Sequence, residues 1–404
     1  MRQESTNPEL SVFKTCIAAA VASLACVSAF AQSNVTLFGI VDASVRSVSN
    51  KSDRVSGSLF TPTSFKSSRT ELATGGLSSS RLGFRGVEDL GGGLYASFWL
   101  EAPLRNDDGS EALAFTRRSI VAVGGAFGEI RLGRDNTPIH LNHLQWDPFQ
   151  DTGLGASLLI AANGASNPNN VAATGGFGSN SNYKRASNMV QYFLPPNLGG
   201  FYGNIAYGFS EQSRIDFTQN VNTGRYIGGR AGYKAGPLDA AIAYGESDTA
   251  YSNRLGKIKT FNVGASYDFG VVKLFGDYTT SADRRDNAVG SFVSTPKVDM
   301  SGYSIAATVP VGVGQIRASY AQVKYDLNSP LLFNAGDPSA RKFVIGYVHN
   351  LSKRTALYTN VARITNKNGA GLSLGGPSYV TAQSGATYTP KTSTGYEFGI
   401  RHSF

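Results

Sequence analysis

The chain ends in Tyr396-Glu397-Phe398-Gly399-Ile400-Arg401-His402-Ser403-Phe404, where apolar and polar side chains alternate up to a terminal aromatic residue. Successive side chains of a β-strand point to opposite faces, so this strand has one apolar face and one polar face. Such a strand suits the wall of a membrane-spanning barrel, where one face meets lipid and the other meets water. It would also suit the half-buried edge of a soluble sheet, so the rest of the chain must decide.

The N-terminal segment has the parts of a secretory signal peptide. Arg2 and Lys14 lie in a polar lead, an apolar run follows over 16–30, and Ala29-Phe30-Ala31 is a small-x-small cleavage site. The apolar run is shorter than the roughly 20 residues that a transmembrane helix needs. We therefore expect residues 1–31 to be removed.

Both cysteines, Cys16 and Cys26, lie inside this leader. A second interpretation makes Cys26 a lipoprotein acceptor, but Ser23 stands where a large aliphatic residue would be expected. In either case cysteine pairs cannot form a disulfide framework or a cysteine metal site in the rest of the chain.

The composition indicates many short strands and tight turns, with 47 Gly, 23 Phe and 19 Tyr against 16% charged residues. No apolar stretch after residue 31 is long enough to cross a bilayer as a helix. A chain without such a helix can cross a membrane only as a closed sheet. No linker or shift in composition divides the remainder, so we expect 32–404 to be one domain.

Segments of period 2 recur along the chain with turn signals between them, as in hairpins. The clearest segments cover 201–209, 238–244, 261–269, 272–278, 303–309, 314–325, 342–349 and 354–365. Counted from Val35, they predict about 16 strands, an even number as in single-chain bacterial barrels. The predicted fold class is all-β, a transmembrane antiparallel β-barrel.

Short and long connections alternate along the chain. Short turns are expected at 90–93, 124–128, 235–237 and 350–352. Polar loops are expected at 49–77, 103–113, 135–185, 210–224, 246–256, 280–297, 326–340 and 367–393. This alternation gathers the long loops at one end, which is extracellular in outer-membrane barrels, whereas the short turns are periplasmic.

The third loop, 135–185, contains an apolar stretch from Leu154 to Ala162. Long loops in compact folds are usually functional. We expect this loop to fold inward against the barrel wall and narrow the lumen. The alternative is a helix that lies on the extracellular rim.

Several motifs, taken in chain order, resemble the trimeric general-diffusion porins of Gram-negative outer membranes, in particular those of the β-proteobacterial type. They are Asn34 to Asp42, Ser80 to Leu94, Phe127-Gly128 with Leu132-Gly133-Arg134, Asn188 to Tyr192 with Pro195 and Phe201, and the terminal Phe404. The resemblance implies a 16-stranded barrel, a homotrimer and a third loop folded into the pore. It also implies that Phe404 is a signal for the barrel-assembly machinery.

Two features depart from the common pattern of that family. Residues Gln145 to Asp151 stand where a Pro-Glu-Phe-Gly-Gly-type segment is expected, which leaves the shape of the constriction open. Arg118 stands where related chains tend to carry an uncharged polar residue.

Alternation also predicts which charged side chains face the water-filled lumen. The predicted pore-lining basic residues are Arg46, Arg81, Arg85, Arg117, Arg131 and Arg134. The predicted acidic residues of the constriction loop are Asp135, Asp147 and Asp151. Fixed positive charge in a narrow pore attracts anions and repels cations, so we expect anion preference. Alternatively, some of these arginines bind lipopolysaccharide phosphates or keep the wall solvated.

Other classes of function find little support. The formal charge of +9 is spread over many segments without a basic run, which disfavours nucleic-acid binding. His140 and His143 lack the glutamate of metalloprotease motifs, and neither a nucleophile elbow nor a phosphate-binding loop occurs, so we expect no metal, cofactor or enzymatic activity.

The sequence thus predicts an outer-membrane channel for passive diffusion of small hydrophilic solutes and ions. A substrate-specific anion channel and an adhesin that acts through its exposed loops are the alternatives. The expected partners are further copies of the chain, lipopolysaccharide and other outer-membrane lipid, and the barrel-assembly machinery.

Overall fold

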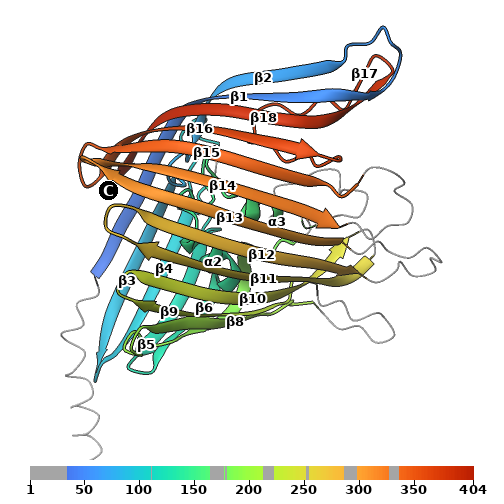
Figure 1. Ribbon diagram of the computed structural model, residues 1–404. Helices are drawn as coiled ribbons and strands as arrows, with labels where there is room; N and C mark the ends of the chain where they lie inside the picture. Colours follow the sequence, from blue (N-terminus) through green and yellow to red (C-terminus); the bar gives the residue numbers. More distant parts are fainter. Residues whose placement is uncertain are drawn as a thin grey trace, which may run out of the picture.

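A computed structural model describes residues 34–110, 112–163, 177, 180–212, 223–251, 254–285, 298–326 and 336–404. Two helices, α2 (Pro138–Gln145) and α3 (Leu158–Asn163), lie inside a barrel of antiparallel strands (Figure 1). The strands are β1 (Asn34–Ser56), β2 (Ser64–Thr74), β3 (Arg81–Gly91), β4 (Leu94–Pro103), β5 (Arg118–Gly125), β6 (Gly128–Asn136), β7 (Arg185–Phe193), β8 (Phe201–Gly208), β9 (Tyr226–Ala235), β10 (Leu238–Tyr251), β11 (Arg254–Asp268), β12 (Lys273–Arg285), β13 (Val298–Val311), β14 (Gly314–Asp326), β15 (Ser339–Asn350), β16 (Thr355–Lys367), β17 (Ala382–Gln383) and β18 (Ala386–Ser403). The expected signal peptide at 1–31 lies outside the described residues.

The barrel is closed by β1, which pairs with β18 on one side and with both β2 and β3 on the other. Ala43 lies opposite Thr74 and Ile40 opposite Arg81, so β2 and β3 are two halves of one wall strand, interrupted at 75–80. The two-residue β17 pairs only with the end of β18. The described wall therefore has 16 strands, as predicted.

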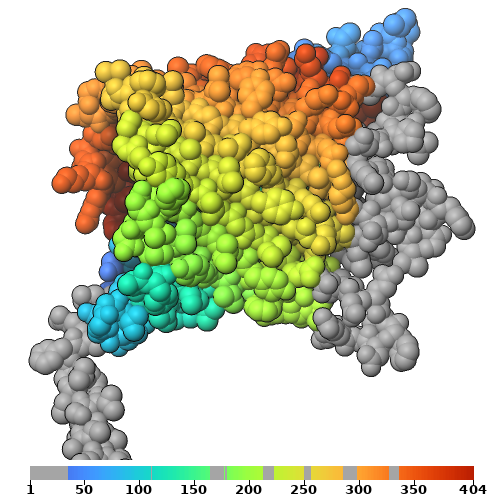
Figure 2. Space-filling model, turned by 60° about the horizontal axis from the view of Figure 1, so that its bottom comes forward, coloured from blue at the N-terminus to red at the C-terminus, as the bar shows by residue number. Residues whose placement is uncertain are grey.

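Apolar residues cover the outside of the barrel, and polar ones face the interior. In β18, Tyr396 and Phe398 are 63% and 60% exposed on the outer face, whereas Glu397 between them is 1% exposed. Figure 2 shows the outer wall from β8 to β16, in green to orange, as a continuous surface. In a bilayer these outward side chains leave water, which contributes about 1.5–3 kcal/mol for each fully buried large one. No helix in the described ranges is long and apolar enough to span a membrane.

Two segments that were expected to be loops are mostly strand. Within 49–77, β1 continues to Ser56 and β2 begins at Ser64; within 246–256, only residues 252–253 separate β10 from β11. Their polar side chains are paired across the strands, as in the 3.0 Å hydrogen bond from Thr70 Oγ1 to Ser47 Oγ. A hairpin that rises above the membrane has water on both faces, so its sequence loses the apolar alternation while its backbone pairing continues. Much of the loops expected at 210–224, 280–297 and 326–340 lies outside the described residues.

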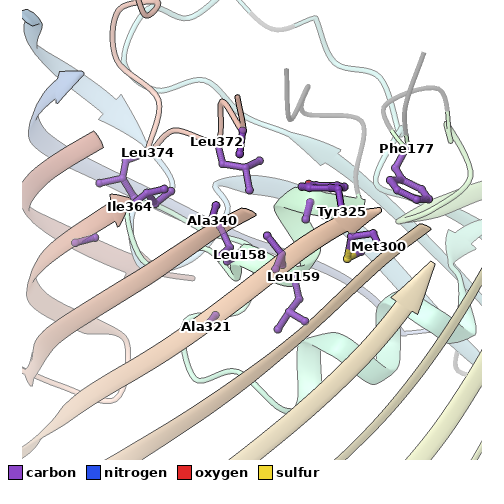
Figure 3. Close-up of a cluster of buried hydrophobic side chains, with 14 of the residues drawn as sticks. Leu158, Leu159, Phe177, Met300, Ala321, Tyr325, Ala340, Ile364, Leu372 and Leu374 are labelled. Atoms are coloured by element: carbon purple, nitrogen blue, oxygen red, sulfur yellow. The ribbon is translucent and has the colours of Figure 1, made fainter. Parts of the chain in front are cut away.

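The third loop folds into the lumen, as predicted. Helix α2 packs against β8 to β11, and α3 packs against β13 and β14. Leu154, Leu158, Leu159 and Ala162 are buried in one apolar cluster with inward side chains of the far wall. Figure 3 shows Leu158 and Leu159 of α3 beside Ala321 and Met300 of that wall. The loop therefore fills one side of the lumen and leaves the side of β1 to β6 open.

Candidate pore constriction

Side chains of the third loop pack directly against the backbone of wall glycines, which have no side chain in the way. Trp146, at the end of α2, is fully buried against Gly264 of β11. A Cβ atom at position 264 would lie 2.1 Å from the indole Cδ1 of Trp146, so a larger residue there would force the loop away. Leu154 lies in the same way against Gly395 of β18, where an added Cβ would be 3.0 Å away.

Polar contacts fix the same loop to the wall between β12 and β18. The backbone N–H of Leu154 donates to Glu397 Oε1 at 3.1 Å, and Arg317 Nη1 donates to the carbonyl of Pro148 at 3.0 Å. His143 Nδ1 lies 2.7 Å from Asp277 Oδ2 of β12. These contacts set the distance of the loop from the opposite wall, and with it the width of the passage.

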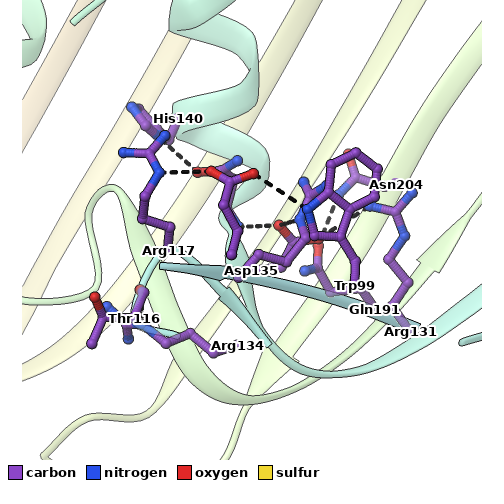
Figure 4. A network of polar contacts seen from close by, with 12 residues as sticks. Trp99, Thr116, Arg117, Arg131, Arg134, Asp135, His140, Gln191 and Asn204 are labelled. Carbon is purple, nitrogen blue, oxygen red and sulfur yellow. Dashed lines mark hydrogen bonds and ion pairs between the residues drawn. The ribbon is translucent and has the colours of Figure 1, made fainter. Parts of the chain in front are cut away.

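On the open side, three carboxylates each lie between two arginines. Glu71 binds Arg46 and Arg69, both at 2.5 Å. Glu101 binds Arg117 at 2.6 Å and Arg81 at 3.3 Å. Asp135 binds Arg118 at 2.7 Å and Arg131 at 3.1 Å. Figure 4 shows Asp135 and Arg131 of the last group, with Trp99 beside them. The groups of Glu71 and Glu101 each keep one net positive charge on the wall, whereas Arg131 of the third group also binds Glu129.

The narrow passage runs between these groups and the segment Gln150 to Gly153 of the third loop. Its two adjoining stretches share Arg117, Asp151, Thr152 and Ser79. Towards one end the passage is lined by Arg46, Arg69 and Glu71, and towards the other by Arg81, Trp99 and Arg185. The pairing register places Arg69 opposite Val48 and Arg85 opposite Thr36, so the basic residues extend over about 40 Å of strand at roughly 3.3 Å per residue.

The predicted basic residues lie on two different faces. Arg46, Arg81, Arg85, Arg117 and Arg131 lie on the water-facing side. Arg85 is exposed there, with its guanidinium 5.3 Å from the Trp99 ring. Arg134 shares the opposite face of β6 with the exposed, outward Leu132, because side chains alternate without interruption from Arg131 to Asp135. Arg134 donates to the Thr116 carbonyl at 2.6 Å and to Ser187 Oγ at 2.8 Å (Figure 4).

The predicted acidic residues occupy three environments. Asp135 belongs to the end of β6 and is bound by arginines, whereas Asp151 lines the passage and lies 3.4 Å from Lys184 Nζ. Asp147 is buried beneath the loop, where its carboxylate accepts from the Phe149 N–H at 2.8 Å, and burial raises its pKa to about 6. Asp147 therefore does not face the passage.

The loop histidines have separate carboxylate partners. His140 Nε2 lies 3.3 Å from Asp151 Oδ2, and complete burial lowers the pKa of His140 to about 4. Burial alone would raise the pKa of Asp151, but its contacts with His140 and Lys184 outweigh burial and hold that pKa well below its usual range. In the described ranges, no group of three or more His, Cys, Asp or Glu residues could hold a metal.

Several lining residues were missed from the sequence. Arg69 lies in β2, within a segment that the sequence predicts as a loop, and Arg185 begins β7, where the sequence predicts the end of the third loop. Arg118 begins β5 and is absent from the predicted lining. Alternation back from the outward Leu72 would have pointed to Arg69 and Glu71.

Comparisons with known proteins agree with this geometry. The sequence profile of Gram-negative porins matches residues 18–369. Outer membrane porin protein 32 of Delftia acidovorans is 40% identical over 393 residues, which are 97% of this chain and 99% of that protein. The chain belongs to the Gram-negative porin family. The present chain is also 29% identical to an outer membrane porin protein of Bordetella pertussis over 379 residues, which are 85% of this chain and 92% of that protein.

A solved structure supports the same assignment. An anion-selective porin from Comamonas acidovorans matches this porin with a TM-score of 0.73 and 37% identity, over 92% of this chain and 100% of that chain. The predicted family, fold and place in the Gram-negative outer membrane are thereby confirmed. The porin forms a water-filled channel through which small hydrophilic solutes and ions diffuse.

Proposed function

We propose that this porin prefers anions, and that the arginines of β1 to β7 set this preference. The observation that carries the proposal is the excess of positive charge along the passage. Its lining includes seven arginines, namely Arg46, Arg69, Arg81, Arg105, Arg117, Arg118 and Arg185, against four carboxylates, namely Glu71, Glu101, Asp107 and Asp151. Arginine keeps its charge at any physiological pH. A water-filled passage with such an excess concentrates anions and repels cations.

The pairing of the carboxylates strengthens this proposal. Glu71 and Glu101 are each bound by two arginines, and Asp151 lies beside Lys184 and His140. A carboxylate that already has cationic partners offers little to a passing cation, whereas two guanidiniums that share one carboxylate retain donors for a passing anion. The anion-selective porin from Comamonas acidovorans is similar to this chain over 92% of this chain's length.

The reversal potential of the purified porin in a planar bilayer under a KCl gradient tests the proposal. We expect anion preference, with a Cl⁻ to K⁺ permeability ratio that falls roughly threefold or more in the variant Arg46→Gln/Arg81→Gln/Arg117→Gln. The matched control is Arg134→Gln, which removes one arginine from the outer face of β6 and should leave the ratio unchanged. The preference should also weaken in 1 M salt, where the Debye length is about 3 Å.

A cation preference in the unmodified porin would overturn the proposal. So would a permeability ratio that the triple substitution leaves unaltered. No catalytic step forms part of the proposed function.

We further propose that the porin works as a homotrimer after removal of residues 1–31. Leu59 and Phe60, at the tip of the connection between β1 and β2, are 91% and 99% exposed, which favours contact with another copy. On the outer face, Lys259 and Lys324 border a groove that also holds Tyr244 and Phe261, together with Asp299 and Asp326. The ammonium groups beside outward aromatic rings support contact with a phosphate-bearing lipid such as lipopolysaccharide.

The terminal Phe404 supports a role in recognition by the assembly machinery. Its backbone N–H and carbonyl are both paired with Gly39 at 3.1 Å, and its ring covers Gly39, where a Cβ atom would be 2.3 Å from the ring. The last residue thus completes the seam between β18 and β1, and we propose that the machinery reads it before the seam closes.

A further inference from the structure

An apolar surface lies inside the water-filled passage. Phe38, Ile40 and Trp99 project from β1 and β4, and Leu144 projects towards them from the third loop; all four are partly exposed. They line a cavity of about 420 Å³, within the range of small-molecule sites. An exposed indole and phenyl ring at the narrow part offer a passing solute an apolar contact surface that inorganic ions cannot use.

Arginines surround this apolar surface. Arg81, Arg117, Arg118 and Arg185 line the same cavity, against Glu101 and Asp151. The guanidinium of Arg118 lies 4.7 Å from the centre of the Trp99 ring. Arg185 forms no ion pair within the described parts of the chain, and its buried Nε has no hydrogen-bond partner there. The cavity therefore has a spare cationic donor next to an aromatic surface.

We propose that this cavity binds aromatic carboxylates on their way through the channel. The carboxylate would accept hydrogen bonds from Arg185 and Arg117, and the ring would lie against Trp99 and Phe38 with Leu144 on the other side. The Phe38 and Trp99 rings already meet edge to face, with centroids 5.2 Å apart at 69°. The inference rests on the proposed anion preference and adds a substrate class to it.

Both halves of the ligand are needed for recognition. A small anion such as acetate can bind the guanidiniums but cannot cover the indole, and a neutral aromatic compound can cover the indole but leaves Arg185 without an acceptor. Charged hydrogen bonds and aromatic stacking each contribute to affinity. Permeation of an aromatic carboxylate should therefore saturate at a lower concentration than permeation of acetate.

Tryptophan fluorescence gives a direct test, because the chain has two tryptophans, Trp99 in this cavity and Trp146 of the third loop, which is buried against β11. In the variant Trp146→Phe, Trp99 is the single emitter. Titration with 4-nitrobenzoate should give saturable quenching that benzoate relieves and acetate does not. The neutral 4-nitrobenzyl alcohol should quench only linearly, by collision.

Two further variants in this background separate binding from general damage. Arg185→Gln should weaken the apparent affinity for 4-nitrobenzoate about tenfold, as expected for the loss of one charge-assisted interaction. Arg134→Gln, on the outer face, should leave it unchanged. In the unmodified chain, benzoate should reduce single-channel chloride current in a saturable manner, and acetate at equal concentration should not, which checks the result without any substitution.

Linear quenching of equal size by 4-nitrobenzoate and 4-nitrobenzyl alcohol would overturn the inference. Saturable quenching that Arg185→Gln leaves unaltered would also overturn it. The reversal potential in KCl is measured without any aromatic compound, so anion preference together with linear quenching would reject the aromatic site alone. Cation preference would reject the proposed function whatever the quenching shows.

Discussion

At the scale of single residues, the wall of the passage is organised by carboxylates that each hold two arginines. Arginine side chains in a narrow channel repel one another, and they are too long to hold one position without partners. Glu101 lies between Arg81 and Arg117 and is largely buried, so it both reduces their repulsion and fixes their direction. The acidic residues of the wall therefore position the charge rather than reverse it.

This arrangement predicts the effect of Glu101→Gln. The variant keeps the shape of the side chain but leaves one more net positive charge at the passage, so anion preference should rise. Stability should fall by about 1–3 kcal/mol, because two partly buried guanidiniums lose their charged acceptor. The reversal potential and the urea midpoint measure the two effects. Glu88→Gln, at the exposed end of β3, is the control and should change neither quantity. A lower anion preference in Glu101→Gln would contradict the positioning role.

Residue positions also show where alternation from the sequence succeeds. Counting by twos from outward apolar residues places Arg46 and Arg81 on the water side, where the structure has them. Arg134 was expected in the lumen, but it lies three residues from Arg131, and strict alternation places it on the outer face, as in the structure. The bulge beside it, between Gly133 and Asp135, involves β7, where Asn188 has a φ of 56°, and leaves the alternation of β6 intact.

At the scale of elements, the third loop narrows the channel because it is packed on one wall. Its apolar part could be recognised from the sequence, because the stretch Leu154 to Ala162 would be unfavourable in a fully solvated loop. The wall against which the loop packs could not be predicted. The loop lies against β8 to β18 because Gly264 and Gly395 leave room for Trp146 and Leu154, and these pairs are more than 100 residues apart.

Two buried groups of this loop titrate with opposite consequences. The pKa of His140 in the packed loop is about 4, below its ordinary 6.5, so packing loses stability as the pH falls from 6.5 to 4. The pKa of Asp147 is about 6, above its ordinary 3.8, so packing gains stability as the pH falls from 6 to 3.8. Asp151 stays ionised over this window, because its pKa lies well below its usual range. The two shifts therefore act on the packing of the loop in opposite directions.

Single substitutions should uncover each effect. Asp147→Asn keeps the acceptor for the Phe149 N–H but removes the carboxyl group whose protonation opposes the effect of His140. The loop should therefore loosen in acid, and its packing should lose up to about 3 kcal/mol of free energy by pH 4. His140→Gln should have the opposite effect on loop packing. In the double variant, loop packing should change little between pH 7 and pH 4. The measurement is single-channel conductance between pH 7 and pH 4. His402→Gln, outside the loop, is the control. Equal pH profiles for all the variants would show that these groups do not govern the loop.

At the scale of the whole molecule, the barrel is stable only when β18 meets β1, because an open sheet edge in lipid leaves backbone groups unpaired. Phe404 completes this seam over Gly39. We expect Phe404→Ser to lower the amount of assembled porin in the outer membrane several-fold. The porin that does assemble should still migrate as a heat-sensitive oligomer, with three copies and bound lipopolysaccharide by native mass spectrometry.

The control for that experiment is Phe269→Ser, which changes an exposed phenylalanine at another short turn. It should leave the amount of assembled porin unchanged. An equal loss in both variants would indicate a general need for aromatic residues at this end of the barrel. A single copy in the mass spectrum would contradict the proposed trimer.

The barrel, its approximate number of strands and the inward third loop could all be predicted from the sequence. These follow from local rules, since alternation, turn residues and loop length act between neighbours in the chain. Only the folded barrel shows which wall the loop covers, how Arg185 joins the lining, and how three carboxylates each meet two arginines. Those features depend on pairs such as Trp146 with Gly264 and Leu154 with Gly395, which lie more than 100 residues apart and meet only because the loop crosses the closed barrel.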